Sequence, residues 1–336
     1  MFEVDFLPVG EASRSGDAIC MRFTRPDTGG QAVVVIDAGF ETSGDALVEH
    51  IKTFYRTTVV DLAILTHPDG DHIGGMGKLV RGLSVRELWL HDIGAHGGAT
   101  LPAAKAVDDL IAVATGQGVA VREAWAGASR FGGAITVLGP TKDYYEQLVQ
   151  EQVDGASARS SAAASLVESA RSLLERVTTM LGIETPFEAK EVNPRNNSSM
   201  IVRGLFDDRP SLFTADAGVP ALDAAWDYAE SAGIADTPVM TQLAHHGSRR
   251  NCSSAWLDRL LGPTGQTTGT RTAIASCASK SAKHPSGRVI NAHKRRGCDV
   301  VATAGGALCH NSGGLARPNW GPATPLGPMV EEPDED

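Results

Sequence analysis

Apolar residues in the first third of the chain occur in short runs that are separated by glycine-bearing turns. Runs at 2–7, 18–24 and 32–36 have the length and β-branched content of strands, and the turns between them favour antiparallel hairpins. Residues 59–65 are apolar almost without interruption, which is typical of a strand buried on both faces. The spacing over 43–56 instead predicts a helix, with Ser43 as its N-cap.

The alternation of strand-like and helical segments continues to about residue 303. The predicted strands lie at 87–90, 119–123, 134–138, 200–206, 211–214, 239–244, 272–276 and 299–303, and the predicted helices at 101–115, 219–231, 253–261 and 286–296. Residues 142–183 differ, because they are rich in Ala, Ser, Glu and Gln and indicate two helices broken near Asp154-Gly155. We interpret them as a helical insertion in a domain spanning 1–310, and the Pro- and Gly-rich acidic segment 313–336 as a flexible tail.

Composition narrows the class of protein. Of the 336 residues, 42% are hydrophobic and 21% are charged, which is usual for a globular protein. The net charge of −10 argues against a protein whose whole surface coats nucleic acid or an anionic membrane. The five cysteines are odd in number and form no CxxC pair, so we expect free thiols in a reducing compartment. No signal-peptide pattern and no run of about 18 apolar residues occurs, and we expect a cytoplasmic protein without membrane contact.

The strongest chemical signal comes directly after the buried run, in Thr66-His67-Pro68-Asp69-Gly70-Asp71-His72-Ile73-Gly74-Gly75. Four potential metal ligands lie within six residues there, at a strand end where α/β folds place their sites. Aspartates this close repel one another, and a divalent cation is the simplest compensation. A purely structural turn, with Asp71 as a helix cap, explains the cluster less well because a cap needs only one carboxylate.

Two later clusters also follow predicted strands. One is Thr214-Ala215-Asp216-Ala217-Gly218, and the other is Gln242-Leu243-Ala244-His245-His246-Gly247-Ser248. Taken alone, each is commoner as a turn or as a structural histidine pair. Three such clusters in one domain favour a shared metal centre. Two divalent ions about 3.5–4 Å apart can clamp the attacking and leaving oxygens of a hydrolysis.

In this order the motifs resemble those of metallo-β-lactamase-fold hydrolases, and more narrowly those of the soluble hydrolase domain of ComEC-type competence proteins. The resemblance covers most of the chain, from Phe2 to about Gly306. Its further marks are Gly16-Asp17-Ala18, Ile36-Asp37-Ala38-Gly39, Asn196-Asn197-Ser198-Ser199 and His284-Pro285. It implies an α/β fold of the αββα type, a four-layer sandwich in which two mixed sheets face each other. The helices lie outside, and the site lies at one edge between the sheets.

The resemblance also implies a role for each ligand. His67 and Asp69 would belong to a first metal site, Asp71 and His72 to a second, and Asp216 would bridge the two. His245 or His246 would complete the second site. These residues would hold two divalent ions, and Asp69, which stands where the family pattern has a histidine, shifts the preference from zinc toward manganese.

One family histidine has no counterpart here, because the matching stretch is Asn196-Asn197-Ser198-Ser199. Asn197 or Ser199 would then bind substrate phosphate or a weakly held first metal. Beside the metal loop, Ser248 and Arg249 are candidate substrate contacts. His284 is either a phosphate contact and general acid or a helix-capping histidine, and both readings stay open.

Together these residues predict a metal-dependent hydrolase. We expect a phosphodiesterase or nuclease that acts on DNA, RNA or a nucleotide through a metal-bound hydroxide, with Asp69, Asp71 and His284 as the catalytic residues. Two alternatives remain open: a hydrolase of another ester, thioester or lactone on the same fold, and a degenerate binding module without activity. Residues 142–183 are a candidate docking surface for a protein partner.

Overall fold

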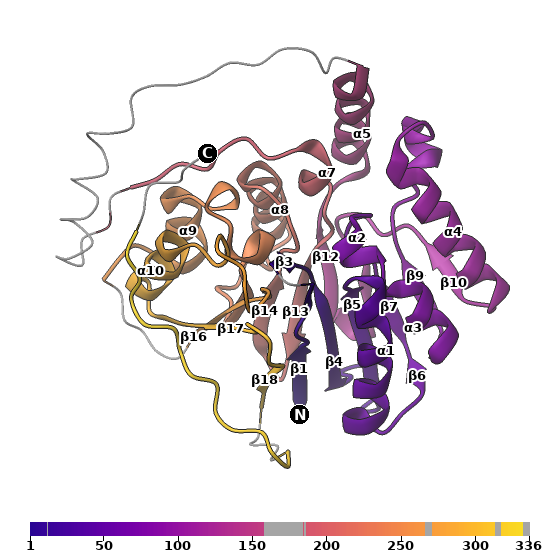
Figure 1. Ribbon diagram of the computed structural model, residues 1–336, viewed down its shortest axis with the longest axis horizontal. Coiled ribbons are helices and arrows are strands. Elements are labelled where there is room, and N and C mark those ends of the chain that lie inside the picture. The colour runs from indigo at the N-terminus through magenta and orange to yellow at the C-terminus, as the bar shows by residue number, and fades with distance from the viewer. Residues whose placement is uncertain (12, 158–183, 185, 266–270, 313–316, 332–336) are drawn as a thin grey trace.

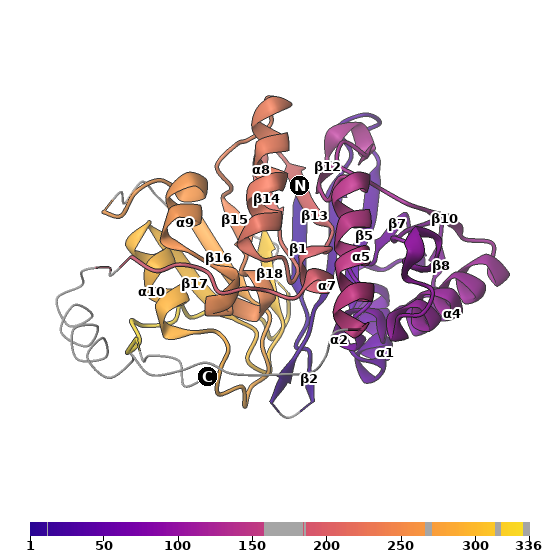
Figure 2. The same cartoon turned by 90° about the horizontal axis from the view of Figure 1, so that it is seen from above.

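The computed structural model describes residues 1–11, 13–157, 184, 186–265, 271–312 and 317–331. Side chains that alternate between the two faces of the central strands explain how the protein forms layers. In β5 (Gln31–Ala38), Val34 and Ile36 face a core between two sheets, while Val33 and Val35 face a second core beneath helices. A third core lies under the helices of the other sheet. The predicted αββα architecture is therefore confirmed (Figures 1 and 2).

The first sheet is built mainly from the N-terminal part of the chain. Its strand order is β10 (Ala120–Arg122), β9 (Glu87–Trp89), β7 (Leu62–Ile64), β5, β4 (Ala18–Thr24), β1 (Phe2–Phe6) and β18 (Leu308–Asn311). The pairs β1–β4 and β4–β5 are antiparallel, as the hairpin pattern predicts, whereas β5–β7, β7–β9 and β9–β10 are parallel. Two small ribbons, β2 (Gly10–Glu11) with β3 (Arg14–Ser15) and β6 (Val59–Val60) with β8 (Ser84–Val85), flank it.

The second sheet carries the C-terminal part of the chain. Its order is β11 (Ser129–Arg130), β12 (Ile135–Gly139), β13 (Ile201–Phe206), β14 (Arg209–Phe213), β15 (Met240–Gln242), β16 (Arg271–Ala275) and β17 (Cys298–Ala302). Strands β14 to β17 are parallel, so their carboxyl ends meet at one edge. That edge faces the end of β7, and this meeting brings the predicted clusters together.

Helices cover the two outer faces. The first sheet is covered by α1 (Glu41–His50) with the π-helical turn η1 (Ile51–Tyr55), α2 (Gly70–Ile73), α3 (Met76–Gly82), η2 (Gly94–Gly98) and α4 (Pro102–Gly116). The second is covered by α8 (Val219–Ser231), α9 (Ser254–Leu261) and α10 (Gly287–Arg295). Between the two groups stand α5 (Lys142–Ser157) and α7 (Pro194–Asn197), and short 3₁₀ turns lie at η3 (Phe131–Gly133), η4 (Ala244–Gly247) and η5 (Arg249–Asn251).

Two local predictions are wrong. Ser43 is not the N-cap of α1, because Gly39 turns the chain at a φ of 68° and the helix already begins at Glu41. The run 59–65 is two strands rather than one. Asp61 separates them, and its carboxylate accepts a hydrogen bond from Val33 N at 2.9 Å where the chain passes from the small ribbon into the main sheet.

The predicted helical insertion is partly described. Helix α5 runs through Asp154 and Gly155 without the expected break. Gln150 Nε2 donates to Asp154 Oδ1 at 2.9 Å along the helix surface, and one exposed glycine costs only about 1 kcal/mol. Residues 158–183 lie outside the described residues, and the docking of a partner there stays a prediction.

The C-terminal segment contacts the body at both of its described ends. Strand β18, which the sequence pattern does not indicate, pairs with β1. Arg317 binds Asp5, and Glu331 is 3% exposed and pairs with Arg295 at 2.8 Å. Between these contacts most residues of 317–331 are exposed and none is in a helix or strand, and the flexibility of the tail stays a prediction. Within the described parts of the chain, no helix has the length and apolar character needed to cross a membrane.

Candidate metal centre

His67 and His72 stand beside the short helix that follows β7. His67 lies in the turn before α2 and His72 within α2, and their exposed fractions are 3% and 0%. The turn packs closely on β5. A Cβ atom at Gly75 would lie 2.1 Å from the carbonyl oxygen of Ala38, so only glycine fits there. The glycines of the motif thus allow the backbone to approach the sheet at the site.

Asp37, at the end of β5, sets the orientation of both imidazoles. Thr66 Oγ1 donates its proton to Asp37 Oδ2 at 2.6 Å. The hydroxyl oxygen of Thr66 is therefore left to accept a hydrogen bond from His67 Nδ1 at 3.1 Å. Ser199 Oγ lies 3.3 Å from the same nitrogen. His72 Nδ1 donates to Asp37 Oδ2 at 2.7 Å. Both rings therefore turn Nε2 toward the interior of the centre, which is the arrangement of metal-ligating histidines.

His245 and His246 come from the turn η4, after β15. Both have left-handed backbone conformations, with φ of 48° and 59°, which are costly for residues with a side chain and cluster at functional sites. The turn directs the two neighbouring imidazoles into the centre from one wall. His245 Nδ1 lies 3.2 Å from Asn251 Oδ1 and 3.3 Å from Asn196 Nδ2, which leaves Nε2 to face inward.

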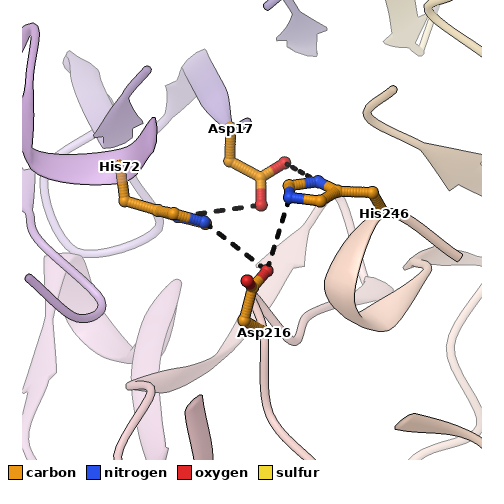
Figure 3. A group of neighbouring side chains, drawn as sticks. All are labelled: Asp17, His72, Asp216 and His246. Carbon is orange, nitrogen blue, oxygen red and sulfur yellow. Dashed lines mark ion pairs between the residues drawn. The ribbon is translucent and has the colours of Figure 1, made fainter. Parts of the chain in front are cut away.

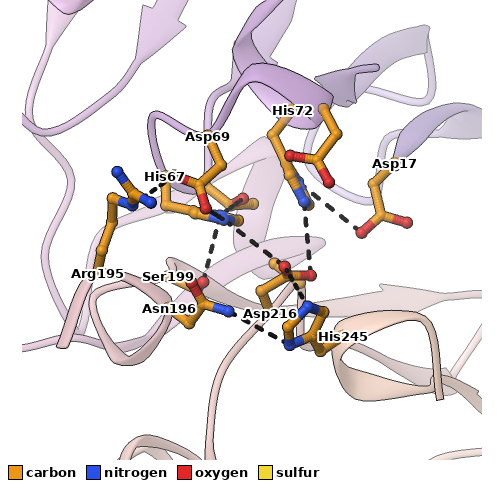
Figure 4. Close-up of polar contacts among 12 residues, drawn as sticks. Asp17, His67, Asp69, His72, Arg195, Asn196, Ser199, Asp216 and His245 are labelled. Carbon is orange, nitrogen blue, oxygen red and sulfur yellow. Dashed lines mark hydrogen bonds and ion pairs between the residues drawn. The ribbon is translucent and has the colours of Figure 1, made fainter. Parts of the chain in front are cut away.

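Asp216 lies between the four histidines, and each of its carboxylate oxygens faces a different group (Figures 3 and 4). The first group consists of His72, His246 and Asp71, and we call it the His72 set. Asp216 Oδ1 is 3.5 Å from His72 Nε2 and 3.8 Å from His246 Nε2, and His246 Nε2 is 3.8 Å from Asp71 Oδ2. The second group consists of His67, His245 and Asp69, and we call it the His67 set. Asp216 Oδ2 is 3.8 Å from His67 Nε2 and 3.5 Å from His245 Nε2, and His67 Nε2 is 3.7 Å from Asp69 Oδ2. All seven predicted metal ligands thus meet in one place.

The donor atoms fit divalent cations. Within the described part of the chain, several of them are buried without a hydrogen-bond partner, namely His67 Nε2, His72 Nε2, Asp216 Oδ1 and both ring nitrogens of His246. An unpaired buried polar atom costs free energy, and the three Nε2 atoms converge on Asp216, whereas His246 Nδ1 faces Asp17. Histidine nitrogens and carboxylate oxygens in this combination suit zinc, manganese or iron. Divalent ions bound beside Asp216 would satisfy the unpaired atoms that face it.

The ionisable side chains of the centre strongly shift one another's pKa values. Burial alone would raise the pKa of Asp216, but the surrounding His245, His72 and His246 lower it well below its usual range. Burial would likewise lower the pKa of His72, yet Asp216 and Asp37 raise it well above the usual value. The carboxylates around His72 thus favour its protonated form, and a metal ion bound to this imidazole would have to displace that proton.

Asp17 also belongs to the centre, although the sequence reasoning assigned it no role (Figure 3). Its oxygens lie 3.9 Å from the Nδ1 atoms of His72 and His246, behind the rings, and Gln242 Nε2 donates to it at 2.9 Å. Burial raises the pKa of Asp17 to about 6. Together with His72, Asp216 and His246 it forms a buried group of potential ligands. The sequence feature that could have identified Asp17 is the motif Gly16-Asp17-Ala18.

The centre opens into a pocket of about 480 Å³. Three residues of the centre line it, namely Asp71, His245 and His246. Its other lining residues are Ser13, Arg14, Ser15, Phe40, Gly70, Ser281, Ala282, Lys283 and His284. Burial, followed by the nearby His246 and His245, lowers the pKa of His284 to about 4. This lowered pKa favours the neutral imidazole, and both expected roles of His284, phosphate contact and general acid, stay predictions.

The other predicted substrate contacts are engaged within the protein. Asn197 accepts a hydrogen bond from Gly218 N at 3.0 Å, and this bond holds the turn after Asp216. Ser199 faces His67, as described above, and Ser248 Oγ accepts from Arg250 N at 3.2 Å. Arg249 is half-buried in η5. The structure therefore gives Asn197, Ser199 and Ser248 local positioning roles, while their contact with substrate stays a prediction.

Arg195 is a second functional neighbour that the sequence did not reveal. It lies on α7 and its Nε is 2.5 Å from Asp69 Oδ1, as an ion pair at the edge of the His67 set (Figure 4). Asn193 caps this short helix by accepting from Asn196 N at 2.9 Å, which fixes the position of Arg195. No local pattern announces the contact, because it joins two segments far apart in sequence.

The sequence matches the family model of the metallo-beta-lactamase superfamily over residues 27–264. No curated protein matches it. Among solved structures, a mutant of CmlA beta-hydroxylase is 13% identical, with a TM-score of 0.39 over 90% of this chain and 46% of that one. A Cronobacter sakazakii metallo-beta-lactamase with a HARLDQ motif is 11% identical, with a TM-score of 0.36 over 70% and 76%. A metallo-beta-lactamase from Hirschia baltica is 13% identical, with a TM-score of 0.32 over 69% and 80%.

Proposed function

Since the chain belongs to the metallo-beta-lactamase superfamily, whose members are typically metal-dependent hydrolases, we propose that it hydrolyses phosphodiester bonds. The observation that carries this proposal is the charge around the pocket. Arg14 and Lys283 line it together with Asp71, His245 and His246. Two cations beside the ligand cluster suit a scissile group that is itself anionic, whereas the carbonyl of a lactone, thioester or β-lactam is neutral.

The chain's own residues would perform binding and orientation. Arg14 is held with its guanidinium carbon 4.8 Å from the centre of the Phe40 ring, which orders its side chain at the rim. Lys283, in the loop before α10, lines the same pocket and would contact the substrate there. The neutral His284, stacked 5.7 Å from His245, would donate or accept a hydrogen bond beside the phosphoryl group.

The two donor sets would hold divalent ions that act as Lewis acids and lower the pKa of water. Asp216 would hold both, since its two oxygens face the two sets. The resemblance to ComEC-type domains favours a nucleic acid strand over a small diester. We propose DNA or RNA as the first substrates to test.

The test measures hydrolysis of bis(p-nitrophenyl) phosphate and of single-stranded DNA and RNA with added Mn²⁺ or Zn²⁺. We expect turnover that chelation abolishes and that Asp71→Asn reduces at least about a hundredfold, while the matched variant Asp109→Asn, on the exposed face of α4, retains it. A β-lactam, a lactone and a thioester serve as competing substrates. Faster metal-dependent turnover of one of these would replace the proposal, and bound metal without any turnover would favour a binding module.

A further inference from the structure

The two donor sets share Asp216 but differ in how their histidines are enclosed. In the His72 set, the side chains of His72 and His246 are 0% and 4% exposed. In the His67 set, His67 is 0% exposed but His245 is 32% exposed. The carboxylates do not separate the sets, since Asp71 is 27% and Asp69 20% exposed. The His67 set is therefore the more open of the two on its histidine side.

The groups behind the histidines differ in charge. Behind His72 Nδ1 lies the carboxylate of Asp37 at 2.7 Å, and Asp17 lies 3.9 Å from both His72 and His246. Behind His67 Nδ1 lie only hydroxyls among the described residues, and behind His245 Nδ1 lie side-chain amides. A carboxylate behind a ligating histidine raises the basicity of the ring and strengthens its bond to a metal, whereas neutral groups do so less.

Arg195 adds a third difference, and it acts on the His67 set alone. Its guanidinium is paired with Asp69 Oδ1 at 2.5 Å, so one oxygen of this ligand is already engaged and its charge is partly neutralised. A fixed positive charge beside the donor atoms also repels an arriving cation. The counterpart carboxylate, Asp71, faces His246, which is itself a ligand of its own set.

From these three differences we infer that the two metal positions have unequal affinities, and that Arg195 sets the difference. The His72 set holds one ion tightly. The His67 set binds its ion weakly because Arg195 competes for Asp69. The protein then has one resident ion and one exchangeable ion, so a step that needs both would depend on the free metal concentration. The inference rests on the proposed metal centre, but it concerns binding and can fail while hydrolysis is confirmed.

The test titrates the chelator-treated full chain with Mn²⁺ alone, without substrate. Calorimetry gives the two dissociation constants, and elemental analysis after dialysis gives the ion retained. We compare Arg195→Gln with Arg86→Gln, which removes another arginine–aspartate pair, Arg86–Asp61 at 2.7 Å, outside the centre. We expect one tight and one weak ion in the unmodified protein. Arg195→Gln should tighten the weak ion about tenfold and leave the tight ion unchanged, and Arg86→Gln should change neither.

A second variant covers the case in which Arg195→Gln does not fold. Asp69→Asn keeps the shape of the side chain and should abolish the weak ion while one ion per chain is retained after dialysis. Two ions of equal affinity in the unmodified protein would overturn the inference. So would an unchanged weak constant in Arg195→Gln, or loss of the tight ion in Asp69→Asn.

Discussion

Two buried clusters of the molecule contain the same kinds of residue, and they balance their charge in opposite ways. In the candidate metal centre, Asp17 and Asp216 lie among histidines, and several donor atoms are unpaired. On the helix-covered side of β1, Glu3 and Asp5 lie close to His50, Cys20 and Cys309, which are also potential ligands. By residue type alone, either cluster could hold a metal.

The second cluster differs because the chain supplies its own cation. Arg317 reaches back from the C-terminal segment and donates to both oxygens of Asp5 at 2.8 Å and to Glu3 at 2.5 Å. Tyr55 Oη adds a bond to Asp5 at 2.7 Å. This bidentate guanidinium on Asp5, together with Arg22 on Glu3, neutralises both carboxylates, although Glu3 Oε1 accepts no hydrogen bond from the described residues. The two clusters therefore differ in what balances their buried carboxylates: arginines for Glu3 and Asp5, and histidines for Asp216.

Removing that internal cation is expected to have the largest effect. Arg317→Met removes the bidentate partner of Asp5 and one of the two arginines that pair with Glu3, and loss of one side of a buried pair costs about 3–5 kcal/mol. We expect a fall of that size in the free energy of unfolding, measured by urea denaturation with an unchanged m-value. Lys105→Met, at an exposed pair with Asp109, is the control and should leave the midpoint in place. Equal stability of the Arg317 variant would mean that the tail does not neutralise this cluster.

The metal centre should respond in affinity rather than in folding. Asp37→Asn keeps the shape of the side chain but removes the charge that orients His72, and such changes behind a ligand cost about 10–100-fold in metal affinity. Calorimetry with Mn²⁺ measures this loss. Asp45→Asn, at the exposed pair Asp45–Lys78, serves as the matched control. An unchanged affinity for the tighter ion would show that His72 is not one of its ligands.

The same contrast explains which features could be predicted from sequence. The motif around His67 and His72, Asp216 and the His245-His246 pair each follow a strand whose apolar pattern is local, so their convergence at one sheet edge follows from the fold class. The choice between His245 and His246 could not be made from sequence. It depends on two consecutive left-handed residues, which place one ring in each donor set.

The missed residues are those whose role depends on distant segments. Arg195 meets Asp69, and Arg317 meets Asp5 over a separation of 312 residues. Strand β18 escaped notice because it is short and becomes a strand only by pairing with β1. Asp17 is part of a motif, but its position behind His72 and His246 depends on a contact with the other sheet. Gln242, at the end of β15, donates a hydrogen bond to Asp17, just before β4. Local patterns contain no information on these long-range contacts.

The smallest expected effect is a difference in how the contributions of the two clusters to stability depend on pH. Burial would raise the pKa of Asp5, but hydrogen bonds from His50 and Arg317 outweigh it and lower the pKa below 3.8. A carboxyl whose folded pKa is lowered stabilises the protein above its unfolded pKa, and this stability is lost as the pH falls through the folded value. In Arg317→Met one of the groups that lower the pKa of Asp5 is gone, so the variant takes up this proton at a higher pH than the unmodified protein. The advantage of the unmodified protein should therefore be largest near pH 7 and shrink, by up to about 1 kcal/mol per pH unit, as the pH falls through the pKa of Asp5 in the variant.

The metal centre should lose its cation much earlier. The raised pKa of His72 means that protons compete with the metal already at neutral pH, so the rise in melting temperature caused by Mn²⁺ should shrink from pH 7 downward. Melting curves of the metal-loaded protein, the chelated protein and the chelated Arg317→Met variant at each pH separate the two contributions. If the Mn²⁺-dependent rise instead persisted to pH 4, the ion would not be held by imidazoles, and the contrast between a bound ion and an internal guanidinium would not hold. An arginine keeps its charge throughout this range, whereas the imidazoles around Asp216 gain protons, which is why the stability gained from the ion should respond to pH near neutrality.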